Sequence, residues 1–113
     1  MNRVFKKLVR DKVPDIIRKK GEIPVTCILS NEDFKRELYK KLKEEVREVI
    51  KAENEAETLE ELADVFEVVS AIAELNNRSM SDVVMIADAK RKMRGGFDNR
   101  IYLEETYSKE ISK

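Results

Sequence analysis

Two short acidic runs lie in the middle of the chain. Residues 44–48 read EEVRE and residues 61–64 read ELAD, so three glutamates fall within five positions and a glutamate and an aspartate follow three apart. Clustered carboxylates are typical ligands of hard divalent cations, Mg²⁺ first and Mn²⁺ second, with Ca²⁺ as a further option. The chain has no histidine. Zinc–histidine sites, Ser-His-Asp triads and histidine acid–base chemistry are therefore excluded.

The first run belongs to a segment with helical periodicity, which predicts a helix from about Asn31 to Ala52. Successive helical residues are rotated by about 100°. Counted from Leu38, Glu45 is only about 20° away, within an apolar stripe that also includes Phe34, Leu42, Val49 and Ala52. Glu48 lies about 60° beyond Glu45, and Glu44 slightly further round. An unpaired carboxylate is costly to bury, so these positions favour a ligand-binding role.

The second run opens another predicted helix, from Thr58 to about Leu75, in which Thr58 and Glu61 have the spacing of a capping box. Two apolar stripes follow this helix. One contains Leu59, Leu62, Phe66, Val69 and Ala73, and the other contains Val68, Ala71, Ile72 and Leu75. Extended backwards at helical spacing, the second stripe reaches Asp64 and Glu61. Both helices thus carry acids where the periodicity predicts packing.

An antiparallel pairing of these helices, connected near residues 53–57, would bring Glu45, Glu48, Glu61 and Asp64 to one level. Close carboxylates repel one another by roughly 4 kcal/mol per pair at an intermediate dielectric, and a divalent cation would remove that repulsion. A different interpretation is that the acids form a solvated helix face and that Glu61 merely caps Thr58.

Length and composition favour a single all-α domain, residues 1–113, with 104–113 as a frayed tail. The 113 residues include only three glycines and two prolines. We expect a short helix that Asp11 caps and that stops at Gly21, an extended stretch IPVTCIL, and a cap at Ser30. Asn-Asn-Arg-Ser at residues 76–79 should form a turn, and a third helix should start at Ser79 or Ser81 and stop at Gly95-Gly96.

The single cysteine, Cys27, fits a small buried apolar residue in a reducing cytoplasm. No apolar run approaches the length that spans a membrane, and the N-terminus lacks the apolar core of a signal peptide. We therefore expect a cytoplasmic protein without a membrane partner.

The net charge is zero, but the charges are segregated. Residues 1–20 hold eight basic residues and two acids, 44–67 hold ten acids and two basic residues, and 90–100 hold five basic residues and one acid. Basic side chains beside a metal-binding centre suit phosphate, and the candidates are Arg10, Lys12, Lys90 and Arg94. Taken singly, each also fits an exposed solubilising charge. Nucleic acid is not expected as a partner, because the acidic centre would repel a continuous backbone.

Four blocks of the sequence resemble the all-α nucleoside triphosphate pyrophosphohydrolases, a superfamily of MazG-like proteins, phosphoribosyl-ATP pyrophosphohydrolases and dimeric dUTPases. They are KLVRDKVPDII, KLKEEVREV, EELADVFEVV and RGGFDNRIYL. The resemblance spans residues 6 to about 103 and is greatest to a small branch that opens with Leu-Val-Arg-Asp-Lys. Longer relatives carry a Lys-Phe-x-x-Arg-Phe segment after the third helix, whereas this chain has KMRGGF.

The resemblance implies a MazG-like bundle with two long antiparallel helices and a third shorter one, completed as a homodimer or homotetramer. It implies Mg²⁺ ligation by Glu45, Glu48, Glu61 and Asp64, with Glu44 or Glu45 orienting or deprotonating the attacking water. The implied reaction cleaves a nucleoside triphosphate between the α and β phosphates, giving the monophosphate and pyrophosphate. Small branches of such families often remove non-standard nucleotides. The alternatives are a non-catalytic helical dimer that serves as an interaction or regulatory module, and a nucleotide-binding module without catalysis.

Overall fold

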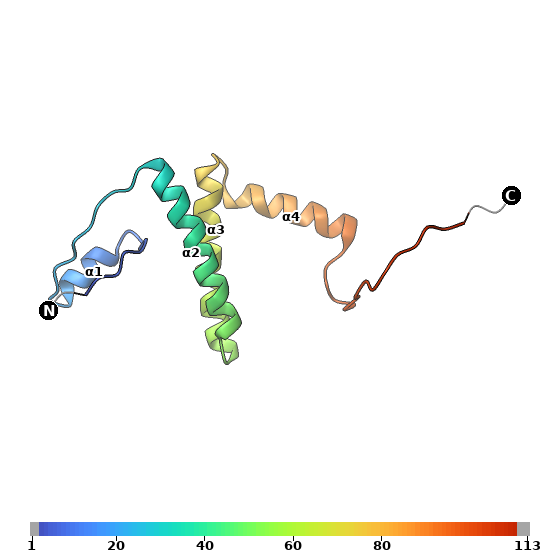
Figure 1. Ribbon diagram of the computed structural model, residues 1–113, viewed down its shortest axis with the longest axis horizontal. Helices are drawn as coiled ribbons and strands as arrows, with labels where there is room; N and C mark the ends of the chain where they lie inside the picture. Colours follow the sequence, from blue (N-terminus) through green and yellow to red (C-terminus); the bar gives the residue numbers. More distant parts are fainter. Residues whose placement is uncertain (1–2, 111–113) are drawn as a thin grey trace. The chain divides into compact units, whose positions relative to one another are not determined.

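The computed structural model describes residues 3–110, which contain four α-helices and no strand. The helices are α1 (Val13–Lys19), α2 (Asn31–Lys51), α3 (Glu55–Leu75) and α4 (Met80–Arg94) (Figure 1). The prediction of an all-α chain is confirmed. The chain divides into two units, Met1–Met80 and Ser81–Lys113. None of the described helices is both long and apolar enough to cross a membrane.

Helix α1 is short and ends where the sequence predicts. Its N-cap is Lys12, without a side-chain hydrogen bond, rather than the expected Asp11. At its end Gly21 has a φ of +89°, which an L side chain rarely adopts. This turn lets the N–H groups of Gly21 and the next residue donate to the carbonyls of Arg18 and Ile17, at 3.0 and 3.2 Å. Gly21 therefore stops the helix by satisfying its last carbonyls.

The stretch between α1 and α2 forms neither helix nor strand. Ile23, Val25 and Ile28 are almost fully exposed there. Cys27 is also exposed, so the prediction that it is a buried apolar residue is wrong. A β-branched run buries its side chains and pairs its backbone only beside another strand, and the described residues offer none.

Helix α2 begins and ends close to the predicted positions. Ser30 is its N-cap, and the Ser30 Oγ accepts a hydrogen bond from the Asp33 N–H at 3.2 Å. Leu38, the origin of the predicted apolar stripe, is buried at 3% exposure. The other stripe members are half-buried, namely Phe34, Leu42, Val49 and Ala52. The periodicity therefore identified the inward face correctly.

Helix α3 starts one turn earlier than the sequence analysis predicts. Asn54, not Thr58, is the N-cap, and its side chain accepts a hydrogen bond from the Glu57 N–H at 2.9 Å. Glu57 in turn accepts from the Glu53 N–H at 3.0 Å, close to the reciprocal pattern of a capping box. Thr58 lies inside the helix and donates its hydroxyl to the Asn54 carbonyl at 2.8 Å. The connection between α2 and α3 is consequently residues 52–54, shorter than the predicted 53–57.

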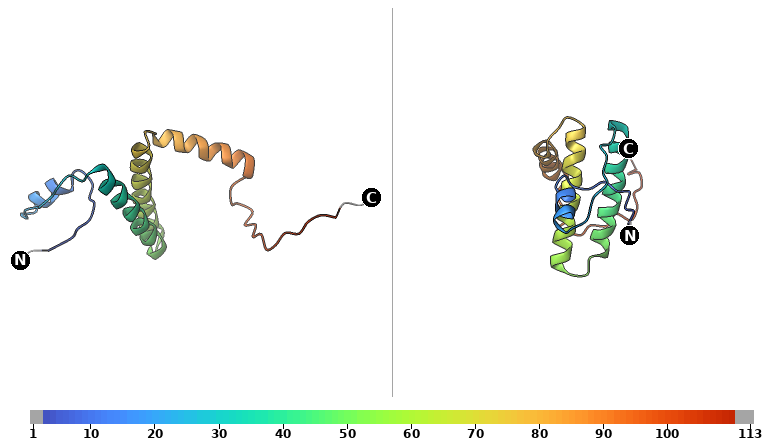
Figure 2. Two further views of the ribbon diagram at one scale, coloured as in Figure 1. Left: turned by 45° about the horizontal axis from the view of Figure 1, so that its top comes forward. Right: turned by 90° about the vertical axis from the view of Figure 1, so that its left-hand side faces the viewer.

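The two long helices lie side by side and run in opposite directions, joined at one end by this connection (Figures 1 and 2). Leu38 of α2 and Val68 and Ala73 of α3 are the buried apolar residues of the described chain. The other apolar stripe of α3 remains open at its start, where Leu59, Leu62 and Phe66 are 60%, 47% and 54% exposed. The stripe that contains Val68 is therefore covered by α2, while no described residue covers the start of the stripe that contains Leu59, Leu62 and Phe66.

The end of α3 is a second left-handed turn, this time at an asparagine. Asn77 has a φ of +60°, and its N–H donates to the Glu74 carbonyl at 2.9 Å. The Arg78 N–H reaches the Ala73 carbonyl at the same distance. These two bonds form the Schellman arrangement. They explain why the predicted turn at Asn-Asn-Arg-Ser ends the helix.

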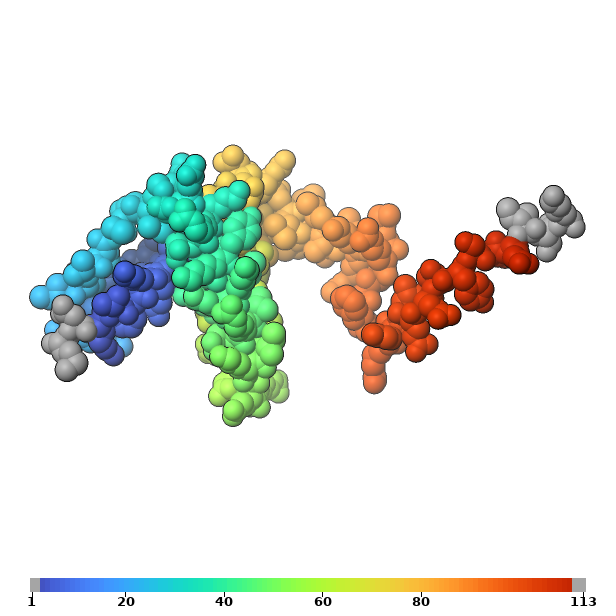
Figure 3. All heavy atoms as spheres, viewed as in Figure 1, coloured from blue at the N-terminus to red at the C-terminus, as the bar shows by residue number. Residues whose placement is uncertain are grey.

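Helix α4 starts between the two predicted serines and stops immediately before Gly95, as predicted. The described residues beyond Ile101 have no helix or strand, and they are exposed along their length (Figure 3). The predicted frayed tail covers residues 104–113, of which the last three lie outside the described residues.

Candidate metal centre

The short connection sets the level at which the two acidic runs meet. Glu45 lies six residues before Lys51, the last residue of α2, and Glu61 lies six residues after Glu55, the first residue of α3. A helix rises about 1.5 Å per residue, so both side chains start about 9 Å from the connection. Because the helices are antiparallel, the two glutamates face each other at one level.

Three carboxylates converge there. Glu45, Glu61 and Asp64 each offer an oxygen, and these oxygens lie within 4.8 Å of one another. All three residues are half-buried, and the Glu45 side chain retains only 14% of its exposure. Glu61 and Asp64 occupy positions on α3 where the periodicity predicts packing against α2. The prediction that acids from both long helices meet at one level is thus borne out for three of the four residues.

The earlier start of α3 decides between two interpretations of Glu61. In a helix beginning at Thr58, Glu61 would be the residue whose carboxylate completes the cap. Because the cap belongs to Asn54, Glu61 instead lies in the second turn and its side chain is not used for capping. The carboxylate is therefore free to join the group with Glu45 and Asp64.

A lysine that the sequence analysis did not single out lies beside the group. Lys41 Nζ is 3.8 Å from both Glu44 Oε2 and Glu45 Oε1. The lysine side chain is 23% exposed, so its charge is less screened than that of a fully solvated lysine. The spacing of three and four residues is the signal that would have identified it.

A second positive charge comes from the segment before α1. Arg10 Nη2 donates to Asp64 Oδ1 at 2.7 Å. The two side chains are 58% and 42% exposed. This pair places one of the predicted phosphate-binding residues at the carboxylate group, although it binds an acid there.

These two cations do not fully offset the acids. The pKa of Glu61 is raised above its ordinary value, first by partial burial and then by the negative charges of Asp64, Glu45, Glu48 and Glu60. A raised pKa means that the local environment disfavours a further negative charge. A bound positive charge would therefore stabilise the folded chain here, and a cation-binding centre requires this property.

The remaining predicted site residues are placed less centrally. Glu48 is exposed and is not part of the three-carboxylate group, although its charge reaches Glu61. Lys12 is exposed at the start of α1. Lys90 and Arg94 are exposed on α4, in the second unit. Their roles in binding phosphate stay predictions.

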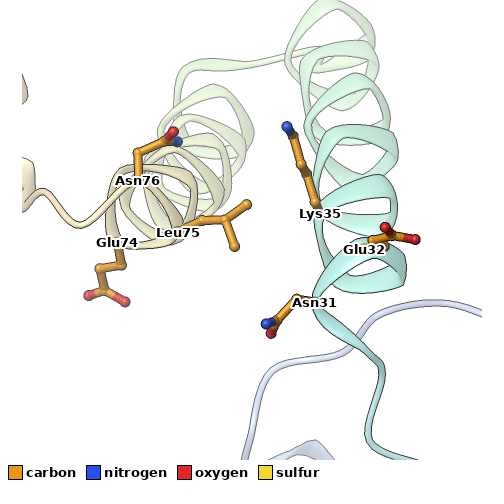
Figure 4. Close-up of a pocket in the computed structure, with 6 residues that line it drawn as sticks. All are labelled: Asn31, Glu32, Lys35, Glu74, Leu75 and Asn76. Atoms are coloured by element: carbon orange, nitrogen blue, oxygen red, sulfur yellow. The ribbon is translucent and has the colours of Figure 1, made fainter.

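A hollow at the other end of the helix pair is separate from the carboxylates. It is lined by the start of α2 and the end of α3, through Asn31, Glu32, Lys35, Glu74, Leu75 and Asn76. Lys35 and Leu75 extend into the space between the helices, whereas Glu32 points away from it (Figure 4). The lining lacks a cluster of like charges or a nucleophile, so the hollow has no evident chemistry of its own.

Comparison of the chain with protein-family models, with curated proteins and with solved structures gave no match in any of the three.

Proposed function

We propose that the chain is a Mg²⁺-dependent nucleoside triphosphate pyrophosphohydrolase that acts on non-standard nucleotides. The observation that carries this proposal is the convergence of Glu45, Glu61 and Asp64 from two antiparallel helices. These are three of the four positions that the family resemblance assigns to the metal. The proposal therefore combines a sequence pattern with a geometry that suits it.

The donor set fits the proposed ion. Carboxylate oxygens are the ligands that Mg²⁺ and, second, Mn²⁺ prefer. Ligand oxygens of one Mg²⁺ ion are at most about 4.2 Å apart, because each lies about 2.1 Å from the metal. The three oxygens here lie within 4.8 Å of one another, so small side-chain rotations bring them into range. Three protein ligands also leave positions for water and phosphate oxygens.

In the proposed reaction, water attacks the α-phosphorus and the bond to the bridging α–β oxygen breaks. Bound Mg²⁺ would polarise the phosphate and make the attacking water more acidic. Glu44, next to the ligand Glu45 and 37% exposed, accepts the proton of the water in this scheme. Lys41 holds the carboxylates of Glu44 and Glu45 on one side of α2. The products are the nucleoside monophosphate and pyrophosphate.

Arg10 and Lys12 are the proposed phosphate contacts of the first unit. A guanidinium binds two phosphate oxygens at once, and an ammonium acts as a point charge. Arg10 already lies at the carboxylate group through Asp64. Its charge would offset that of the departing pyrophosphate.

We further propose that a second copy of the chain covers the open face of α3, giving a homodimer or homotetramer. Leu59, Leu62 and Phe66 form one exposed apolar face at helical spacing. The described chain buries only Leu38, Val68 and Ala73, a small core for 113 residues. Self-association of helix pairs through such a face enlarges the core without a different partner.

The direct test is pyrophosphate release from a panel of standard and damaged nucleoside triphosphates, with and without Mg²⁺. Glu45→Gln should lower turnover by more than about a hundredfold, because even outer-shell partners of a metal contribute 10- to 100-fold. Glu67→Gln is the matched control, since Glu67 is exposed on α3 and outside the carboxylate group. Circular dichroism should show both variants helical.

Two results would reject the enzyme. One is Mg²⁺-dependent turnover retained by Glu45→Gln, and the other is no pyrophosphate from any substrate of the panel. Nucleotide binding without pyrophosphate release would instead favour the nucleotide-binding module.

A further inference from the structure

Asp64 lies beside both negatively charged and positively charged side chains. It belongs to the three-carboxylate group, and it also accepts the hydrogen bond from Arg10 Nη2 at 2.7 Å. A cation that enters the group meets a guanidinium already bound to one of its ligands. Two positive charges this close repel each other, so the occupancy of the group and the position of Arg10 are coupled.

The Arg10–Asp64 pair also has a mechanical role. Among the described residues, it is the ion pair that connects residues 3–29 with the helix pair α2–α3. The other ion pairs of this segment are internal to it, Arg3 with Glu22 and Arg18 with Asp15. Loss of the contact at Asp64 therefore removes this ionic link between the helix pair and the segment that carries Arg10 and Lys12, two of the four predicted phosphate contacts.

We propose that Arg10 is the internal counter-ion of the carboxylate group, and that a divalent cation displaces it from Asp64 and so frees it to bind substrate phosphate. This inference rests on the proposed function and adds an order of events to it. The cation binds first and releases the guanidinium, which then meets the phosphate. In the metal-free chain the same pair keeps the group partly neutralised.

The first experiment measures the affinity for the metal alone. Mg²⁺ and Mn²⁺ are titrated by calorimetry into the metal-free chain, into Arg10→Gln and into Arg3→Gln. Arg10→Gln should bind about threefold to tenfold more tightly, because a competing positive charge at the site is gone. Arg3→Gln removes the same charge from the same segment, but its partner Glu22 is not in the group. Its affinity should equal that of the unmodified chain.

The second experiment follows the segment itself. The chain has no tryptophan, so Phe5→Trp introduces a single tryptophan, five residues from Arg10, whose fluorescence can be excited selectively. Saturating Mg²⁺ should lower the fluorescence anisotropy of this variant, since the segment gains freedom when Arg10 leaves Asp64. In the double variant with Arg10→Gln, the anisotropy should already be low and should not respond to Mg²⁺. An exposed ion pair contributes only about 0–1 kcal/mol, so Arg10→Gln should remain folded.

Each outcome has a distinct meaning. Equal metal affinities of Arg10→Gln and Arg3→Gln would refute the counter-ion, and an anisotropy that Mg²⁺ does not change would refute the displacement. In both cases the unmodified chain still binds metal, so the proposed function stands. If neither Mg²⁺ nor Mn²⁺ binds the unmodified chain, the inference and the proposed function fall together.

Discussion

The carboxylate group shows which properties of single residues follow from sequence. Glu45 lies in the middle of the inward face of α2, where the 100° rule places it, and Glu48 at about 60° further round is exposed. The spacing of Lys41 from Glu44 and Glu45 also predicts the contacts that this lysine makes. The partner of Arg10 could not be predicted from periodicity, since no local pattern indicates that a residue before α1 contacts α3.

Glu61 gives a prediction about pH. Its folded pKa is raised above the ordinary value of 4.5, so between these two values the folded chain binds more protons than the unfolded chain. Stability therefore falls as pH rises through this window, and above it the charged Glu61 destabilises the metal-free protein. Glu61→Gln should raise the Tm in EDTA at pH 7 relative to the unmodified chain, and should make its decline with pH shallower.

Thermal unfolding followed by circular dichroism from pH 4 to 8 measures this difference. Glu67→Gln removes an acid from the same helix outside the group and should leave the pH profile unchanged. A lower Tm for Glu61→Gln than for the unmodified chain at pH 7 would contradict the crowding of charge at this position.

At the scale of elements, a helix end is predicted correctly where the sequence offers only one suitable capping or terminating residue. Ser30 and Gly21 each offer one suitable cap or stop, and both were identified. Before α3 two patterns of the same form compete, Asn54 with Glu57 and Thr58 with Glu61. The earlier cap adds a helical turn and its hydrogen bonds, and it leaves Glu61 for the carboxylate group. The predicted cap at Thr58 is therefore wrong, and spacing alone does not distinguish it from the cap at Asn54 that the structure shows.

The N-cap of α3 yields a prediction about stability. Asn54→Ala should lower the free energy of unfolding by about 1 kcal/mol, because the Glu57 N–H loses its acceptor. Thr58→Ala is the control, since its hydroxyl bonds only to a carbonyl of the preceding turn and should contribute less. Urea unfolding at one fixed protein concentration measures both. A larger loss for Thr58→Ala than for Asn54→Ala would place the cap at Thr58 after all.

At the scale of the whole molecule, sequence predicted the helices better than their packing. The apolar stripe of α2 is turned inward as expected, whereas one of the two stripes of α3 stays exposed at Leu59, Leu62 and Phe66. Periodicity reports that a face is apolar, but it does not report what covers that face. For the same reason Cys27 was expected in a core and lies in an exposed stretch.

Self-association through α3 is therefore open to direct measurement. Sedimentation equilibrium should give a mass at least twice the 13.2 kDa of one chain. Phe66→Glu should shift the population toward monomer and lower the Tm, because it places a charge in the apolar face. Lys43→Gln changes the net charge by the same amount at an exposed position of α2 and should remain associated. A monomeric unmodified chain would disprove the proposed assembly.

Metal binding should also be visible in the stability of the whole chain. A ligand that binds only the folded state at ten times its Kd stabilises it by about 1.4 kcal/mol. For a chain of this size the Tm should then rise by roughly 5 °C. Differential scanning calorimetry with Mg²⁺ and with EDTA measures the shift, which Glu45→Gln should lose. An unchanged Tm at millimolar Mg²⁺ would count against a magnesium centre.

Because the connection of residues 52–54 is short, the number of residues between a side chain and this connection determines which residue it faces on the other long helix. Leu38 lies thirteen residues before the end of α2, and Val68 lies thirteen residues after the start of α3. These core residues are therefore equally far from the connection, as Glu45 and Glu61 are. Lengthening or shortening both helices by one turn near the connection would keep core and carboxylates in step. Changing one helix alone would slide Glu45 past Glu61 by about 5.4 Å and take the oxygens out of reach of a common ion.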